Sequence, residues 1–156
     1  ADNLKATAEK NGVNSNRLFF IKRLPNAKHL ATYCLMDLFV DTFNFNAHTT
    51  AVEALYMNLP VITKAGDSIA SRAASGILKG VKLDHLICET EEEYQNLIQH
   101  FISNKDELSE LKNTLKNNKG AYSLFDAKQF VKNIEKAYKI IHKKYQNNEQ
   151  TSDIVI

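Results

Sequence analysis

The chain has 156 residues with a formal net charge of +2, of which 44% are hydrophobic and 24% charged. A chain of this length predicts about one domain, and its composition is that of a globular protein rather than a disordered one. Basic and acidic residues nearly balance, and no apolar run reaches the roughly 18 residues of a membrane span. We therefore expect neither nucleic acid nor a membrane as a partner.

The first half of the chain alternates helix and strand signals. A helix is expected at Leu4–Lys10, and Gly12 is a typical stop signal after it. The further expected elements, in chain order, are a strand at Arg17–Ile21, a helix at Ala27–Leu35, a strand at Leu38–Val40, a helix at Thr49–Met57, a strand at Pro60–Thr63, a helix at Ser68–Leu78 and a strand at Leu83–Cys88. Strands separated by helices of about ten residues predict βαβ units. The expected fold is therefore α/β, with a Rossmann-like parallel sheet.

The second half of the chain is predicted to be helical. Thr90 and Glu93 form a capping box that opens a helix to about Ser103. The same signal recurs at Asn104 and Glu107, for a helix to about Asn118. Ser123 and Asp126 then open a long helix. Its apolar stripe consists of Phe130, Ile134, Ala137, Tyr138, Ile141 and Tyr145.

These signals divide the chain into three parts. Residues 1–89 are predicted to form a Rossmann-like nucleotide-binding part that is truncated on its N-terminal side, because the chain opens on a helix with no strand or glycine-rich turn before it. Residues 90–147 are predicted to be the helical C-terminal part of the same domain, and residues 148–156 a flexible tail. Cys34 and Cys88 lie among apolar neighbours and are interpreted as reduced core thiols.

One polar segment joins a predicted strand directly to a predicted helix. It runs from Asp41 to Thr50 and ends in His48, Thr49 and Thr50. Ligands of open α/β sheets bind beyond the carboxyl ends of strands, where a helix N-terminus favours an anion. Glu53, one turn further on, is placed to accept hydrogen bonds from a ribose diol. From spacing alone, the segment is equally typical of a threonine helix cap, an exposed histidine and an ordinary helix glutamate.

Several blocks of this sequence resemble the C-terminal catalytic region of the O-linked N-acetylglucosamine transferases and the SPINDLY-like proteins. The blocks cover nearly the whole chain at consistent spacing. They are His29–Phe43, Ala47–Thr50, Glu53–Thr63, Gly66–Arg72 and Ser123–Phe130. This resemblance implies a GT-B glycosyltransferase of the family 41 type, whose C-terminal domain binds a sugar nucleotide without a metal or other cofactor.

The resemblance also implies roles for individual residues. His48, Thr49 and Thr50 match positions that contact the donor diphosphate and sugar. The positions matched on the nucleoside side are Glu53 for the ribose, His29 for stacking on the base, and Leu24 for reading the base edge through its backbone.

Two positions depart from the N-acetylglucosamine transferases. Asn26 stands where they place a lysine near the nucleotide, and Thr32 where they place an arginine that helps to recognise uracil. Arg72 is interpreted either as a partner of Asp67 or as a residue that lines the cleft. No acid or base that catalyses the transfer is expected among these residues, because the resemblance implies that acceptor proteins bind through tetratricopeptide repeats and a first Rossmann-like domain outside this chain.

The function implied is donor binding for transfer of N-acetylglucosamine from UDP-N-acetylglucosamine to Ser or Thr of cytoplasmic proteins, with the nucleus as a second compartment. His48 favours this branch. Three segments, Met36–Asp37, Asp41–Phe43 and Leu55–Met57, are closer to the SPINDLY-like pattern, for which a GDP-fucose donor is the alternative. A related enzyme that uses UDP-glucose, and a non-catalytic interaction module of the same fold, also remain open.

Overall fold

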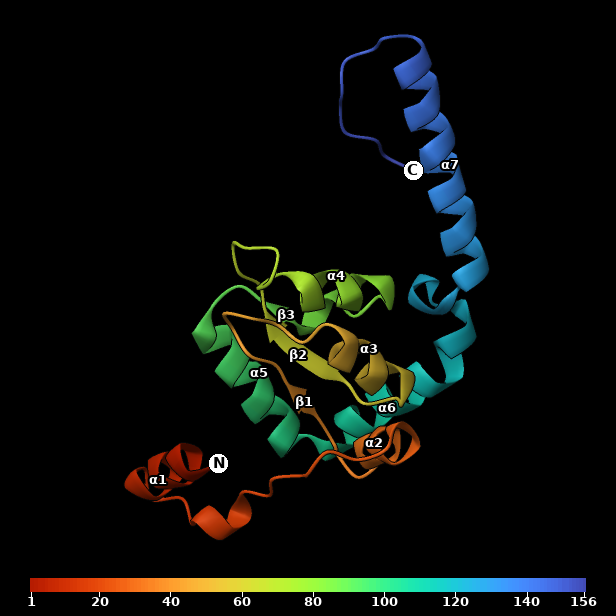
Figure 1. Ribbon diagram of the computed structural model, residues 1–156. Helices are drawn as coiled ribbons and strands as arrows, with labels where there is room; N and C mark the ends of the chain where they lie inside the picture. The colour runs from red at the N-terminus through yellow and green to blue at the C-terminus, as the bar shows by residue number, and fades with distance from the viewer.

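The computed structural model describes residues 1–156, and a small parallel sheet lies at its centre (Figure 1). The sheet has three strands in the order β1-β2-β3. The strands are β1 (Phe39–Val40), β2 (Val61–Lys64) and β3 (Ile87–Cys88). Phe39 pairs with Val61, and Thr63 pairs with Ile87, both in parallel register. The predicted Rossmann-like parallel sheet is therefore confirmed.

Helices cover both faces of the sheet. The two crossover helices, α3 (Thr49–Tyr56) and α4 (Ala73–Gly80), contact each other and β2. Both crossovers step in the same direction across the sheet, and right-handed connections therefore put both helices on one face. Helix α5 (Glu91–Ser103) follows β3, packs on β2 and β3, and returns across the other face. The sheet is thus enclosed, as parallel sheets generally are.

The hydrophobic core lies between these layers. Leu55 and Leu78 from the crossover helices, Ile62 from β2 and Leu86 before β3 are fully buried. Helix α3 turns small residues toward the sheet, since Ala51 and Ala54 are buried as well. Close approach of this helix to the sheet fixes the position of its N-terminus at the carboxyl end of β1.

Four further helices lie outside this α/β layer. They are α1 (Asp2–Lys10), α2 (Asn26–Tyr33), α6 (Lys105–Asn118) and α7 (Ala127–Gln146), with short 3₁₀ turns at Ser15–Arg17, Asp84–Leu86, Lys119–Ala121 and Ser123–Phe125. Helices α1 and α7 project away from the body (Figure 1). Helix α1 ends at Lys10 as predicted, and Gly12 adopts the left-handed conformation with φ of 76°. This is a conformation that side chains rarely tolerate.

Two predicted helix starts are confirmed in atomic detail. The hydroxyl of Thr90 accepts the N–H of Glu93 at 3.1 Å, and the Glu93 carboxylate accepts the N–H of Thr90 at 3.3 Å. Asp126 accepts the N–H of Gln129 at 2.9 Å at the start of α7. Helix α6 begins after Asn104 and ends at Asn118 as predicted, but the capping bond expected there is wrong, because the Asn104 amide donates to the carbonyl of His100.

The strand predicted at Arg17–Ile21 is also wrong. After the 3₁₀ turn that ends at Arg17 the chain is irregular, and Phe19 is 87% exposed. An apolar sequence becomes a strand only where a neighbouring backbone supplies hydrogen bonds. Within these 156 residues the backbone of this segment pairs with no strand. It instead forms part of the wall of a pocket described below.

The helix predicted at Ser68–Leu78 begins only at Ala73. Ser68 and Ser71 explain the delay, because the hydroxyl of Ser71 accepts the N–H of Ser68 at 3.1 Å and the two hydroxyls lie 2.9 Å apart. Such side-chain bonds offer the backbone an alternative to the helix. Gly66 is required beside this turn, since a Cβ there would lie 2.3 Å from the Ser71 hydroxyl.

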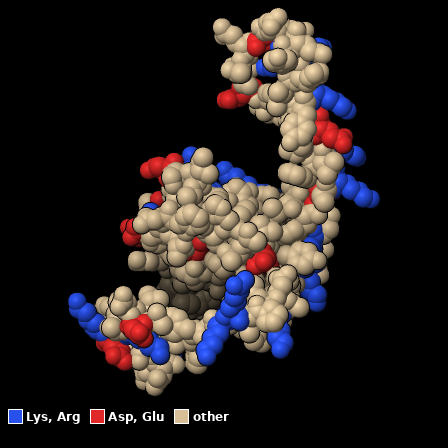
Figure 2. All heavy atoms as spheres, viewed as in Figure 1, with Lys and Arg blue, Asp and Glu red and all other residues tan.

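Helix α7 projects from the body, and none of its residues is buried (Figure 1). The predicted apolar stripe exists as a pattern, yet Phe130 and Tyr138 are largely exposed. Figure 2 shows basic side chains along the outer side of this helix. No helix of the chain is both long and apolar enough to span a membrane. Cys88 is buried as expected, whereas Cys34 is exposed and is not a core residue.

Candidate functional site

The segment between β1 and α3 is held by a buried carboxylate. Asp41 ends β1 and is 5% exposed. Its Oδ1 accepts the N–H of Thr42 at 2.8 Å and that of Ala47 at 2.7 Å. Its Oδ2 accepts the hydroxyl of Thr63, from β2, at 2.7 Å. The carboxylate therefore organises the turn after β1 and ties the loop to the neighbouring strand.

Further hydrogen bonds fix the rest of this loop. The phenol of Tyr94, on α5, donates to the backbone carbonyl of Asp41 at 2.6 Å. Burial and the nearby Asp41 raise the pKa of Tyr94 to about 12, so the phenol keeps the proton that it donates. Asn46 is 1% exposed, and its amide donates to the carbonyl of Thr42 at 2.8 Å. These hydrogen bonds fix the conformation of the loop and therefore the position at which α3 begins.

The start of α3 presents unpaired backbone donors. His48 is the N-cap and forms no side-chain capping bond. The first backbone N–H groups that find a carbonyl are those of Ala51 and Val52, both bonded to His48. The amides of Thr49 and Thr50 have no backbone partner and lie beside two exposed hydroxyls. A helix N-terminus in this state is a site for an anion.

A pocket of about 400 Å³ lies at this helix start. It is lined by residues 39–42 and 45–50, which include all three predicted diphosphate residues. The imidazole of His48 stacks on Phe45, with ring centres 5.0 Å apart and planes 10° apart. This stacking holds the exposed imidazole of His48 against the loop that precedes α3.

A second pocket, of about 510 Å³, lies beside α2. All four residues predicted near the base or nucleotide line it: Leu24, Asn26, His29 and Thr32. The hydroxyl of Thr32 donates to the carbonyl of His29 at 2.6 Å, so its hydrogen is already engaged within the helix. The structure thus gathers these four predicted residues in one place, and their nucleotide-binding roles stay predictions.

Glu53, on α3, contacts two of the residues that line this second pocket, His29 and Tyr33. Its Oε2 lies 3.4 Å from the Nε2 of His29 and accepts the phenol of Tyr33 at 3.3 Å. Tyr33 lies edge-on to the His29 ring, with ring centres 5.2 Å apart. A carboxylate and an imidazole therefore lie side by side at the edge of the second pocket.

Five residues that line the second pocket are absent from the sequence prediction. They are Ile21, Lys22, Arg23, Tyr33 and Met36. Tyr33 was detectable in principle, because it follows His29 by one helical turn and shares its face. Lys22 and Arg23 directly follow the segment Arg17–Ile21 that was predicted to be a strand, and no periodicity pointed to them.

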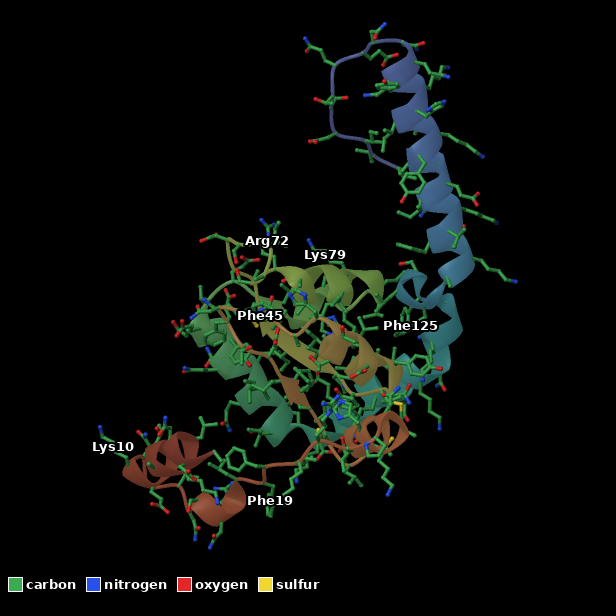
Figure 3. All side chains as sticks on the ribbon, viewed as in Figure 1. Lys10, Phe19, Phe45, Arg72, Lys79 and Phe125 are labelled. Atoms are coloured by element: carbon green, nitrogen blue, oxygen red, sulfur yellow. The ribbon has the colours of Figure 1, made fainter.

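Arg72 lies away from both pockets. It lines a separate cavity of about 370 Å³ with Asp67 and Lys79, and it forms no ion pair. In Figure 3 Arg72 and Lys79 project on the side of α4 that is turned away from α2. The structure therefore does not bring Arg72 to the predicted donor residues. No group of three or more His, Cys, Asp or Glu side chains is arranged to hold a metal ion.

The fold and this pair of pockets define an α/β domain of the Rossmann type with an open helix N-terminus at a strand end. A protein-family model, glycosyl transferase family 41, matches residues 1–134. The chain belongs to this family of glycosyltransferases, as the resemblance of its motifs predicted.

Individual relatives agree with this assignment. The probable UDP-N-acetylglucosamine–peptide N-acetylglucosaminyltransferase SPINDLY of Arabidopsis thaliana is 33% identical over 147 residues, which cover 94% of this chain. The protein of the same description named SEC, from the same plant, is 30% identical over 132 residues, or 84% of this chain. The chain spans only 16% and 14% of these two relatives.

A solved structure extends the likeness to three dimensions. An O-GlcNAc transferase mutant from Thermobaculum terrenum superposes with a TM-score of 0.82 at 32% identity. The superposition covers 88% of this chain and 26% of that transferase. The predicted fold class, a part of a GT-B enzyme with C-terminal helices, is confirmed by this likeness.

Proposed function

We propose that this chain forms the donor-nucleotide-binding part of a protein O-glycosyltransferase. The proposed reaction transfers N-acetylglucosamine from UDP-N-acetylglucosamine to Ser or Thr of cytoplasmic and nuclear proteins. The observation that carries the proposal is the start of α3, where the amides of Thr49 and Thr50 are unpaired at the carboxyl end of β1. The membership of family 41 supports the same conclusion.

The proposed chemistry follows from charge. An acceptor hydroxyl attacks the anomeric carbon, the bond from that carbon to the diphosphate oxygen breaks, and negative charge grows on the leaving diphosphate. Donors aimed in advance at growing charge lower the barrier. In this chain His48, Thr49, Thr50 and the positive end of the helix dipole serve that purpose. The chain's own groups thus act on the leaving group and not on the acceptor.

The nucleoside is proposed to occupy the second pocket. His29 offers its imidazole to the base, because its side chain is 41% exposed and a ligand can reach the ring. Glu53 comes from the same helix that binds the diphosphate, one turn further on. A ligand that reaches both pockets must therefore carry an anionic group, a diol and a flat ring, which is the composition of a nucleoside diphosphate.

A titration of the chain with UDP and GDP tests this site. We expect weak binding, with a Kd in the micromolar to millimolar range, since only the contacts of this chain contribute. In NMR spectra the amide signals of Thr49 and Thr50 should shift first. Shifts that cluster instead on the basic Lys132–Lys144 part of α7 would contradict the assignment.

The identity of the base is expected to depend on position 32. The hydroxyl of Thr32 is bonded to its own helix, so it discriminates little between bases, whereas phosphate and ribose contacts serve UDP and GDP alike. Thr32→Arg should raise the preference for UDP over GDP, and His29→Ala should weaken both nucleotides. Competition of UDP and GDP against the donor measures this, and an unchanged ratio in Thr32→Arg would show that position 32 does not face the base.

A donor of the GDP-fucose type is the alternative. It is favoured by the similarity of the Asp41–Phe43 and Leu55–Met57 segments to the SPINDLY-like pattern. The same competition experiment decides between the two, because GDP would then displace the donor more effectively than UDP in the unmodified chain.

A further inference from the structure

Tyr33 bridges two helices, α2 and α3, that are well separated in the sequence. It is the last residue of α2 and is 4% exposed. Its phenol oxygen lies 3.3 Å from the Nε2 of His29, on its own helix, and 3.3 Å from the Oε2 of Glu53, on α3. With the 3.4 Å between His29 and Glu53, the three polar atoms form a closed triangle.

The triangle leaves one carboxylate oxygen of Glu53 free. Tyr33 and His29 both approach Oε2, whereas Oε1 has no partner within the chain. Burial, and secondarily the Glu53 carboxylate, raise the pKa of Tyr33 to about 12, so its phenol stays protonated and remains a donor. The side chain of Glu53 is 26% exposed, so a ligand can reach it.

We propose that Tyr33 is a positioning residue that holds Oε2 of Glu53 so that Oε1 faces the ribose diol of a bound nucleoside diphosphate. This inference rests on the proposed function. By positioning Glu53, Tyr33 makes the site prefer a ribose to a sugar that lacks the 2′ and 3′ hydroxyls. A glutamate side chain has three rotatable torsions, and fixing them before the ligand arrives removes an entropic cost of binding.

The proposal predicts a selective effect of removing one hydroxyl. Tyr33→Phe retains the ring that packs against His29 and removes the phenol oxygen, and with it the hydrogen bond to Glu53 and the contact with the Nε2 of His29. The hydrogen bond is long, so its loss should reduce the preference for UDP over 2′,3′-dideoxy-UDP by about fivefold. Affinity for the dideoxy nucleotide should stay the same, because Glu53 has no hydroxyl to bind in that ligand.

The experiment measures the affinities of UDP and 2′,3′-dideoxy-UDP by calorimetry in the full chain and in four variants. These are Tyr33→Phe, Glu53→Gln, the double variant and Tyr122→Phe. Tyr122 is a matched control, since it is 6% exposed and its phenol bonds to the carbonyl of Thr114 at 3.5 Å, outside both pockets. Urea unfolding of each variant separates effects on binding from effects on stability.

The expected result is a lower UDP preference in Tyr33→Phe and in Glu53→Gln, with no further loss in the double variant and none in Tyr122→Phe. An equal loss of affinity for both nucleotides in Tyr33→Phe would overturn the positioning role and indicate a structural one. Unchanged discrimination in Tyr33→Phe, with UDP bound normally, would overturn it while leaving the proposed function intact. Failure of the unmodified chain to bind UDP or GDP would contradict the proposed function itself.

Discussion

Asp41→Ala is expected to lower the free energy of unfolding by about 3 kcal/mol. The substitution removes the acceptor of the Ala47 amide and of the Thr63 hydroxyl, which is fully buried. Each buried donor left without a partner costs about 1–3 kcal/mol. Thr42 is an exposed residue, so water can replace the lost acceptor of its amide and this bond adds little. Urea denaturation followed by circular dichroism measures this change.

The same chain supplies a matched control for Asp41. Asp37 precedes β1, its side chain is 87% exposed, and its carboxylate lies 3.4 Å from the amine of Lys112. Exposed pairs of this kind contribute little, so Asp37→Ala should change the free energy of unfolding by less than about 0.5 kcal/mol. Equal effects of the two substitutions would show that the buried network around Asp41 does not organise the loop.

The chain alone is expected to show no detectable transfer of sugar to a peptide. The residues of both pockets are proposed to bind the donor, and none of the predicted site residues is assigned to the acceptor. Holding acceptor and donor together lowers the activation free energy of a two-substrate reaction by about 7–11 kcal/mol. The superposition with the Thermobaculum terrenum transferase covers only 26% of that enzyme.

Mass spectrometry of a Ser- and Thr-containing peptide tests this expectation. The peptide is incubated with the chain and either UDP-N-acetylglucosamine or GDP-fucose, and a complete family 41 enzyme serves as the positive control. We expect no added sugar mass from the chain, although the NMR titration still shows nucleotide binding. Modification of the peptide at a rate comparable with that of the control would contradict the division of roles proposed here.

The sequence by itself determined the elements whose signals are local. The Thr90–Glu93 capping box fixed the start of α5 because both hydrogen bonds join residues three positions apart. Alternation of short apolar runs with helices of about ten residues determined the parallel sheet, since such connections admit few other arrangements. The sequence also placed Thr49 and Thr50 at a helix N-terminus beyond a strand, because that position depends only on the order of two neighbouring elements.

Only the tertiary structure decided whatever depends on residues distant in the sequence. Phe19 and its neighbours have the composition of a strand, but strand formation needs a pairing partner that local sequence does not reveal. The stripe on α7 predicted an amphipathic helix correctly and gave no information on whether that face is buried. Tyr33 and Glu53 meet across 20 positions, and Asp41 and Thr63 across 22. These contacts exist because α2 packs on α3 and β1 pairs with β2, and that packing gives the predicted binding residues their geometry.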